Sequence, residues 1–453
     1  MTDIPTPREP VAAPAMAGRS PALPHGSAAG ARLATAHHPA KDPVTAASGR
    51  GGRDALHPVR RVLFFGKSKS TSGTTRAIVQ GLRALGIRVD WVNCALLKRW
   101  LGERWMRAWV RRQFVRHKPD AVVSFFCDIP SDLLAEFHAT CRTAIWNEEC
   151  VVPLDPSLRT WMAHCDLLCL NNTAQIEDYR GLGAAQVDFV MSGYSPAVHQ
   201  PLDLRWLDAD EPTGQVYDLA FIGSPGHGER RAEMVLSLCR DFDVHVFGRG
   251  WDTWRGRSSR LHLHGAVKPH DFARICAQAR IVLGMNWINS VPFYFSNRTW
   301  MTLGCGGFHL THYVPGLEQI FGQGEHLAWF RDFDELHAQA AKYLAQPRLR
   351  HRIARAGHAL VRNQHTYEHR MARLVEVLAQ VPLPTERSAG ARVAGANGTG
   401  ANGNGANGNG THGAGAHAAA NGATAGAVLA PAPRLPLRGA PPASVRVRPD
   451  ATP

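Results

Sequence analysis

The chain has 453 residues and a formal net charge of +14 at pH 7, a length sufficient for two or three domains. The positive charge favours anionic partners in general and does not separate nucleotide diphosphates from phospholipid head groups or nucleic acid. Its nine cysteines form no Cys-x-x-Cys pair, which favours reduced thiols in a cytosolic protein over disulfides or a zinc site. No run of about 18 apolar residues and no apolar signal core is present, so we expect neither a membrane span nor secretion.

The two ends of the chain differ in composition from its middle. Residues 1–58 are rich in Pro, Ala, Gly and His, and residues 381–453 contain the repeat-like stretch GANGTGANGNGANGNG. Neither segment can bury enough apolar surface to offset its chain entropy. We therefore predict disordered tails on either side of a folded core that runs from about residue 59 to residue 380.

Short apolar runs alternate with helix-length segments in the first half of the core. The runs are RVLFF, IRVDWV, DAVVSFF, TAIWN, DLLCL and QVDFVM. Strands of this length separated by helices indicate a parallel sheet covered by helices. The sequence thus predicts an α/β, Rossmann-like N-terminal domain over residues 59–210.

The same pattern restarts after a charged stretch that contains Pro212 and Gly214, residues typical of a linker. The second set of runs is YDLAFIG, FDVHVFG, LHLHG, RIVLGMN, GFHLT and HLAWF, which predicts a second Rossmann-like domain over residues 215–365. A helix over residues 366–380 could pack back on the first domain. Two such domains would face each other across a cleft, with functional residues in the loops that follow the strands.

Each predicted domain begins with a strand and a glycine-containing loop. The first loop, FFGKSKSTSGTT, is either a structural turn or an anion-binding loop before a helix. In the second loop, FIGSPGHGERRAEM, Gly223 and Ser224 allow close backbone approach and Arg230 follows at a helix start, a combination that suits a diphosphate. The alternative is a flexible loop with solvated arginines.

The stretch from residue 295 to residue 330 carries a family resemblance. It reads NRTWMTLGCGGFHLT followed by PGLEQIF, and it resembles the NRxFExLACGGFxLT and PGLEELF segments of CgeB-like (spore-maturation-type) glycosyltransferases, relatives of the GT-B class. Further blocks from about residue 215 to residue 380 match in the same order, whereas the first domain matches only in outline. The resemblance implies a GT-B-like fold and a nucleotide-sugar donor held mainly by the second domain.

The resemblance also implies positions for the donor. Asn297 and Arg298 lie in the matched segment, and Arg298 is expected to neutralise the donor diphosphate, with a core ion pair as the alternative. The backbone of Gly306 and Gly307 is expected to lie against the same diphosphate. Lys268 is a further candidate for stabilising the departing diphosphate.

A carboxylate in the second matched segment is expected to bind ribose. Glu318 can accept hydrogen bonds from a vicinal diol, although it could also be a plain surface residue. The family pattern has a Glu where this chain has Met301. Methionine can neither transfer a proton nor bind a hydroxyl strongly. This departure therefore has three alternative meanings: a different donor, another residue in the role of the Glu, or weakened catalysis.

The first domain offers carboxylates for the general base that deprotonates an acceptor hydroxyl. Asp128, Glu148 and Glu149 each come just after a predicted strand, where a side chain can face the cleft. Alternatively, Asp128 caps the helix that follows, and the two glutamates are simply solvated.

The histidines do not form a metal motif. His262 and His264 are two residues apart, and His365 and His369 are four residues apart. Neither pair has the Glu of HExxH or a third ligand. We expect no metal, no cofactor beyond the nucleotide-diphosphate sugar as co-substrate, and a metal-independent reaction.

One predicted helix is strongly basic. LLKRWLGERWMRAWVRRQFVRHK places Leu101, Trp105 and Trp109 four residues apart among eight Lys and Arg. Such a helix could lie on an anionic membrane, but we expect it to bury that face on its own sheet, as crossover helices do.

The sequence therefore predicts a cytoplasmic glycosyltransferase, with possible peripheral contact at the inner membrane face. It would transfer a sugar to a glycan, lipid or protein acceptor in glycan or cell-surface polysaccharide synthesis. The alternative is a catalytically silent nucleotide-sugar or glycan-binding protein, motivated by Met301. A specific nucleic-acid binder is disfavoured because no binding module is recognisable.

Overall fold

The computed structural model describes residues 57–67, 73–203, 214–226, 230–268 and 270–385. Nearly all of both expected tails lies outside these residues, as does most of the expected linker. Among the described residues, no helix combines the length and the apolar character needed to cross a lipid bilayer. The described residues form two separate sheets.

The first sheet consists of six parallel strands in the order β2-β1-β3-β4-β5-β6. Its strands are β1 (Arg61–Phe65), β2 (Arg88–Val92), β3 (Ala121–Phe125), β4 (Arg142–Asn147), β5 (Leu167–Leu170) and β6 (Gln186–Phe189). Its helices are α1 (Thr74–Ala84), α2 (Cys94–Leu101), α3 (Glu103–His117), α4 (Ser131–His138), α5 (Arg159–Met162) and α6 (Ile176–Gly181).

The second sheet also has six parallel strands, in the order β12-β11-β10-β7-β8-β9. Its strands are β7 (Tyr217–Ile222), β8 (Val244–Phe247), β9 (Leu261–Leu263), β10 (Ala279–Gly284), β11 (His309–His312) and β12 (Ala328–Phe330). The helices of this half and the end of the core are α8 (Arg230–Leu238), α9 (Asp271–Gln278), α10 (Asn297–Gly304), α11 (Phe333–Leu344), α12 (Pro347–Gln364) and α13 (Tyr367–Gln380). All twelve expected strands are present, and the α/β, Rossmann-like expectation is confirmed.

Both faces of each sheet are buried, which explains the continuous apolar runs. In β1, Val62 and Phe64 belong to one hydrophobic cluster, whereas Leu63 and Phe65 belong to another on the opposite face. Successive side chains of a strand point to opposite faces, so a strand covered by helices on both sides is apolar throughout. β7 behaves in the same way in the second sheet.

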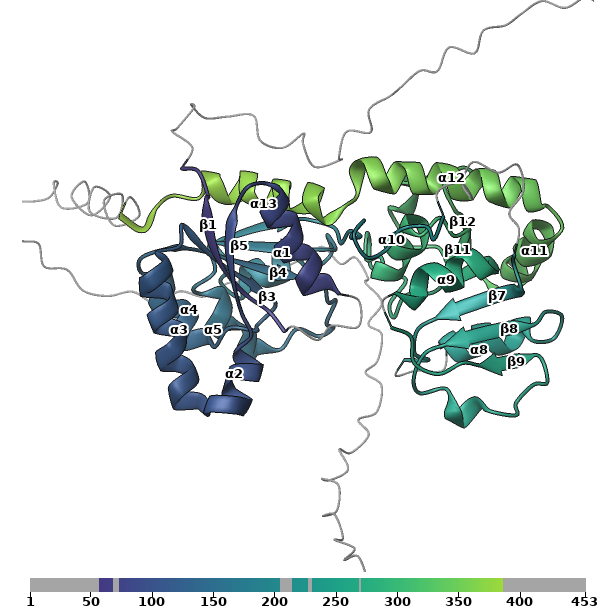
Figure 1. Ribbon diagram of the computed structural model, residues 1–453, viewed down its shortest axis with the longest axis horizontal. Coiled ribbons are helices and arrows are strands. Elements are labelled where there is room, and N and C mark those ends of the chain that lie inside the picture. The colour runs from purple at the N-terminus through teal and green to yellow at the C-terminus, as the bar shows by residue number, and fades with distance from the viewer. Residues whose placement is uncertain (1–56, 68–72, 204–213, 227–229, 269, 386–453) are drawn as a thin grey trace, which may run out of the picture. The chain divides into compact units, whose positions relative to one another are not determined.

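Helix α13, at the end of the described chain, packs on the first sheet's helix α1 (Figure 1). Met371 and Leu374 of α13 share a core with Ile78 and Leu82 of α1. The two helices approach closely at Gly81, where an added Cβ would lie 2.9 Å from the carbonyl oxygen of Tyr367. The last helix therefore covers the domain that contains the first strand.

Helix α3 presents its tryptophans outward, contrary to our expectation. Trp105 and Trp109 are exposed, whereas Met106 and Val110 are buried. Two stripes with the same four-residue spacing, offset by one position, run along this helix, and the one without tryptophan faces the core. The half-buried Phe114 continues the core-facing stripe. Because Trp105 and Trp109 are exposed, the prediction that they are buried on the sheet is wrong.

Truncation of a core contact in α13 should destabilise the protein. Met371 is fully buried against α1, and a buried Met→Ala change costs about 2–5 kcal/mol of unfolding free energy. We expect Met371→Ala to lower the thermal unfolding midpoint by several degrees, measured by circular dichroism. The exposed Glu368→Ala in the same helix is the control and should change it little; equal midpoints for both variants would contradict the packing.

Candidate functional site

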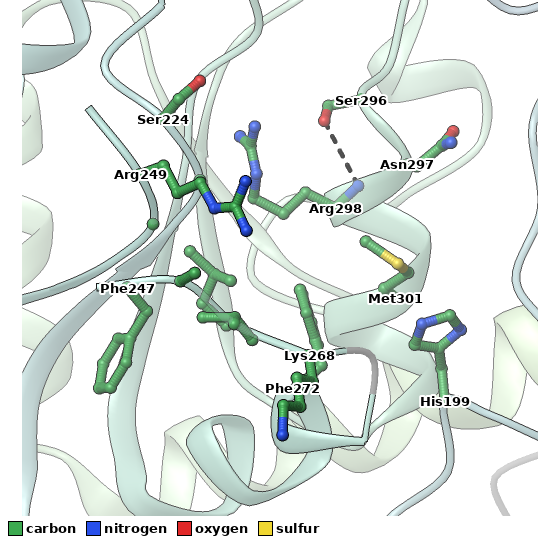
Figure 2. A pocket seen from close by; sticks show the side chains of 15 residues that line it. His199, Ser224, Phe247, Arg249, Lys268, Phe272, Ser296, Asn297, Arg298 and Met301 are labelled. Carbon is green, nitrogen blue, oxygen red and sulfur yellow. Dashed lines mark hydrogen bonds between the residues drawn. The ribbon is translucent and has the colours of Figure 1, made fainter. Parts of the chain in front are cut away.

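A cavity of about 400 Å³ opens at one edge of the second sheet (Figure 2). Its volume falls in the range of small-molecule sites. The lining residues come from the loops after β7, β8 and β9, from the first turns of α9 and α10, and from the segment after β6. They are His199, Ile222, Gly223, Ser224, Phe247, Gly248, Arg249, Ala266, Val267, Lys268, Phe272, Ser296, Asn297, Arg298 and Met301.

The strand order of the second sheet explains the position of this cavity. Counted within its own domain, the order is the 3-2-1-4-5-6 arrangement of dinucleotide-binding folds, in which ligands bind outside the carboxyl ends of the strands where the order reverses. That reversal lies between β7 and β10. The cavity begins at Ile222, the last residue of β7, and includes the start of α10, which follows β10.

Arg298 is held in place without a carboxylate partner among the described residues. Its Nη1 donates to the carbonyl oxygen of Met285 at 3.2 Å, and its guanidinium lies 5.1 Å from the ring centroid of Phe221. Arg231 donates to the same Met285 carbonyl at 3.1 Å. Burial, followed by the neighbouring Arg231, lowers the pKa of Arg298 to about 9, so it remains cationic at neutral pH.

Gly223 makes room for this guanidinium. An added Cβ at Gly223 would lie 3.0 Å from Nη2 of Arg298. The backbone there has φ 153°, a conformation that side chains rarely adopt. Gly223 also carries the carbonyl to which the indole of Trp251 donates at 2.8 Å. Only a residue without a side chain suits this position.

The charges that line the cavity all have one sign. Arg249, Lys268 and Arg298 line it (Figure 2), and none of the fifteen lining residues is Asp or Glu. None of the three cations forms an ion pair with any carboxylate that the structure describes. An anionic group would therefore meet several donors at once, which is the arrangement that binds phosphates.

Glu148 is one hydrogen bond away from the cavity. Its carboxylate accepts from Nδ2 of the cavity residue Asn297 at 3.0 Å and from the hydroxyl of Tyr367 at 3.1 Å. The side chain is only 7% exposed. Burial raises the pKa of Glu148 to about 7 against the lowering effect of these hydrogen bonds. A carboxyl that titrates near neutral pH has the acidity expected of a general base.

Asp128 lies at the reversal point of the first sheet. Its carboxylate accepts from the backbone N–H of Lys67 at 2.9 Å and pairs with Nζ of the same lysine, also at 2.9 Å. Lys67 follows β1 and Asp128 follows β3, and these strands are neighbours. The side chain of Asp128 does not cap α4, whose first turn receives no side-chain cap, so that alternative is wrong.

The structure brings Gly223, Ser224, Lys268, Asn297 and Arg298 together in the cavity lining. The solvated-residue alternative for Glu148 is wrong because this side chain is buried, whereas the neighbouring Glu149 is exposed.

Four expected donor-binding positions do not line the cavity: Arg230, Gly306, Gly307 and Glu318. Arg230 is exposed, with its guanidinium over the ring of Phe333. Gly306 and Gly307 are buried in the turn before β11, at the amino end of the strand, whereas the cavity lies at carboxyl ends. Neither glycine lines the cavity, and an added Cβ at Gly307 would meet Thr302 and Cys276.

Glu318 follows β11 at its carboxyl end but does not line the cavity. It is exposed on a short 3₁₀ segment, and its carboxylate accepts from the hydroxyl of Tyr313 at 3.0 Å. Met301, by contrast, lines the cavity. The position at which the chain departs from the family pattern is thus a position that a bound ligand would touch.

The described residues contain no cluster of three or more His, Cys, Asp or Glu arranged to hold a metal. The chain does contain Asp-x-Asp triplets at residues 208–210, 241–243 and 332–334. The first lies outside the described residues. Asp243 pairs with His262, and Asp332 caps α11, and neither of these two described triplets lines the cavity.

Several cavity residues carry no motif that sequence reasoning could use. Phe247 ends β8, Arg249 lies in the loop that follows, Phe272 lies in the first turn of α9, and His199 comes from the segment after β6. The one available signal was position, because Phe247 ends a predicted strand and Arg249 directly follows it. Burial lowers the pKa of His199 to about 4, so it is neutral at pH 7 and adds no charge.

Comparisons with known proteins agree with this architecture. Residues 230–376 match a protein family described as glycosyl transferase-like. This part of the chain is similar to that family. It contains most of the cavity lining, and the expectation of a glycosyltransferase is confirmed at the level of this domain. No curated protein matches the chain.

Solved structures match over both sheets. A glycosyltransferase from Rickettsia africae ESF-5 has a TM-score of 0.53 at 10% identity, covering 71% of this chain and 98% of its own. Sucrose-phosphate synthase from Thermosynechococcus elongatus has a TM-score of 0.50 at 13% identity, covering 71% and 98%. HepE from Anabaena, solved with UDP and glucose, has a TM-score of 0.49 at 13% identity, covering 71% and 100%. The first two confirm the GT-B-like fold.

A methyl group at Gly223 should weaken anion binding. We expect Gly223→Ala to displace the Arg298 guanidinium and to reduce the affinity for inorganic diphosphate about tenfold, since a charge-assisted hydrogen bond contributes about 1.5–3 kcal/mol. Isothermal titration calorimetry measures this. Gly256→Ala is the control, because Gly256 has a similarly unusual φ of 76° but nothing within 4 Å of an added Cβ. Equal affinities in both variants would contradict the role of Gly223.

The raised pKa of Glu148 makes stability depend on pH. The folded protein holds the proton up to about pH 7, whereas an unfolded glutamate releases it near pH 4.3. Stability contributed by this group is therefore full at low pH and is lost as the pH rises through about 7. Relative to wild type, Glu148→Gln should become more stable as the pH increases from 5 to about 7.5, measured by thermal unfolding. Glu149→Gln, next to it and exposed, should follow wild type.

Proposed function

We propose that this chain binds a nucleotide-diphosphate sugar in the cavity and transfers the sugar to an acceptor hydroxyl. The observation that carries the proposal is a set of cations, Arg249, Lys268 and Arg298, that form no ion pair with a carboxylate among the described residues and lie at the strand-order reversal of a glycosyl transferase-like domain. A diphosphate is the anion that would use several such donors at once.

The cavity offers an apolar side as well as a charged one. Phe247, Val267 and Phe272 contribute side chains to the wall, and such a wall suits the flat face of a nucleotide base. The backbone of Gly223 and Ser224 lines the cavity, and Gly223 lies directly beside the guanidinium of Arg298. The donor diphosphate would lie against Arg298 and Lys268, with the base toward the aromatic residues.

The reaction needs charge stabilisation and one proton acceptor. The acceptor oxygen forms a bond to the anomeric carbon, the bond from that carbon to the diphosphate oxygen breaks, and the nucleotide diphosphate leaves with the electron pair. Arg298 and Lys268 stabilise the negative charge that develops on the leaving group. The proton of the acceptor hydroxyl passes to a carboxylate of the first domain.

Glu148 is the best supported base of the three candidates, of which Glu149 is exposed. Its pKa of about 7 allows it both to accept and to release a proton at neutral pH, and it is hydrogen-bonded to the cavity residue Asn297. Asp128 is already paired with Lys67. We therefore assign the base to Glu148 and a role in ordering the first loop to Asp128.

We propose, more specifically, that this protein is a glycosyltransferase of the CgeB-like subtype. The match of NRTWMTLGCGGFHLT and PGLEQIF to that pattern supports it. Within it, Glu318 would bind the donor ribose after the loop that follows β11 moves toward the cavity. The acceptor would be a glycan, lipid or protein hydroxyl in glycan or cell-surface polysaccharide synthesis, and the reaction would need no metal.

Met301 favours a second candidate, a silent nucleotide-sugar binder. A methionine lines the cavity where the family pattern has a glutamate, so one polar contact to the donor is replaced by an apolar one. Such a protein would bind the donor and release no nucleotide diphosphate.

One experiment separates these functions. Thermal unfolding of the full chain is measured with a panel of nucleotide sugars, since a ligand raises the midpoint by mass action, and nucleotide-diphosphate release is then assayed with any donor that stabilises it. For a transferase we expect stabilisation and release, with Arg298→Ala weakening donor binding at least tenfold and Glu148→Gln reducing release with little change in binding.

The matched control is Arg352→Ala, an exposed arginine on α12 that does not line the cavity. It should leave both readouts unchanged. Stabilisation without release, even with acceptors added, would favour the silent binder. No stabilisation by any donor would contradict both functions.

A further inference from the structure

The surface of α2 and α3 exposes an unusual amount of apolar side chain. Trp100 is 79% exposed, Trp105 69% and Val115 70%. We call the following residues the tryptophan patch: Leu96, Trp100, Leu101, Trp105, Trp109 and Val115. Large aromatic side chains left in water together mark an interaction surface rather than ordinary solvent exposure.

Packing fixes the outward direction of this patch. Phe114 of α3 stacks on Phe137 of α4 with ring centroids 4.1 Å apart. Arg111 pairs with Glu136 of α4 at 2.7 Å, and Arg107 pairs with Asp132 of the same helix. Because α4 holds the opposite side of α3, the helix cannot roll to bury its tryptophans.

Cations share the outward side of α3 with the tryptophans. Trp105, Trp109, Arg112 and Arg116 follow the spacing i, i+4, i+7 and i+11, which places them on one face of a helix. All four are exposed. The face thus carries two indole rings followed by two guanidinium groups.

Several of these cations are not neutralised by the protein. In the described part of the chain, five exposed Lys and Arg of this region form no ion pair: Arg99, Arg104, Arg112, Arg116 and Lys118. The only acidic residue of α2 and α3, Glu103, is already shared by Lys98 and Arg107. Positively charged side chains therefore surround the tryptophan patch.

We propose that the tryptophan patch docks on a bilayer that contains anionic lipid. Indole rings favour the boundary between head groups and acyl chains, and Lys and Arg around them pair with lipid phosphates. Leu96, Leu101 and Val115 add aliphatic surface, which acyl chains accept and stacked nucleic-acid bases do not use.

Charge argues against the other occupants. A second copy of the chain would bring two sets of like charges together. The terminal segments, residues 1–56 and 386–453, each contain more Lys and Arg than Asp and Glu, so neither supplies complementary charge. An anionic bilayer supplies both the negative charge and the apolar layer.

The test is co-sedimentation of the full chain with vesicles of phosphatidylcholine alone or with about 30% phosphatidylglycerol. We expect binding to the anionic vesicles at about 50 mM salt and a marked loss at about 0.5 M salt. Trp100→Ser with Trp105→Ser should weaken binding at least tenfold, and Arg112→Gln with Arg116→Gln about 25-fold, since each cation near an anionic surface contributes about fivefold.

Matched controls make the result specific to this surface. Arg352→Gln with Arg362→Gln removes two exposed arginines from α12 and should bind as wild type does. Circular dichroism checks that each variant is folded. If a tryptophan variant fails to fold, the wild type is tested instead with vesicles that contain lipid brominated on its acyl chains. We then expect strong quenching of the tryptophan fluorescence.

Three outcomes would overturn the proposal. These are no sedimentation of wild type with anionic vesicles at low salt, binding by the α2–α3 variants equal to wild type, and no quenching by brominated lipid. Binding of single-stranded RNA by wild type without binding to vesicles would also overturn it in favour of nucleic acid. A dimer that the tryptophan variant abolishes, again without vesicle binding, would assign the patch to a second copy.

Discussion

Each parallel sheet of this protein must be covered on both faces, and most of its architecture follows from that constraint. Strands such as β1 and β7 are apolar on both sides, so helices occupy both faces and leave only the strand ends for polar loops. The constraint also explains α13, which ends the described chain yet contributes its apolar face to the core around α1. The cavity lies where this coverage stops, at the carboxyl ends of the second sheet.

The fold was predictable from the sequence because doubly buried strands leave an unmistakable pattern. Runs such as RVLFF and YDLAFIG are too short for buried helices and are separated by helix-length segments. The cavity residues were predictable only in part. Gly223, Ser224 and Arg298 follow strands or belong to the matched segment. Arg249 follows a predicted strand but belongs to no motif, and Phe272 has neither signal; the sheet order brings both to the cavity.

Two features could not be predicted from sequence patterns, for clear physical reasons. Gly306 and Gly307 were expected to lie against the donor diphosphate, but a glycine pair does not reveal at which end of a strand it lies; here it precedes β11 and does not line the cavity. In α3, the stripes that begin at Trp105 and at Met106 have the same period. Hydrophobicity cannot choose between them, because the larger residues lie on the exposed one. The choice is made by Arg107 and Arg111, whose partners on α4 cannot be inferred from spacing within α3.

The carbonyl of Met285 has a consequence for how the cavity responds to change. One oxygen accepts hydrogen bonds from both Arg231 and Arg298, and these arginines belong to the first turns of two different helices, α8 and α10. The two guanidinium groups are thereby positioned as a unit rather than separately. A shift of the loop after β10 would move both positive charges together, so the position of the Arg298 charge in the cavity depends on the backbone of that loop.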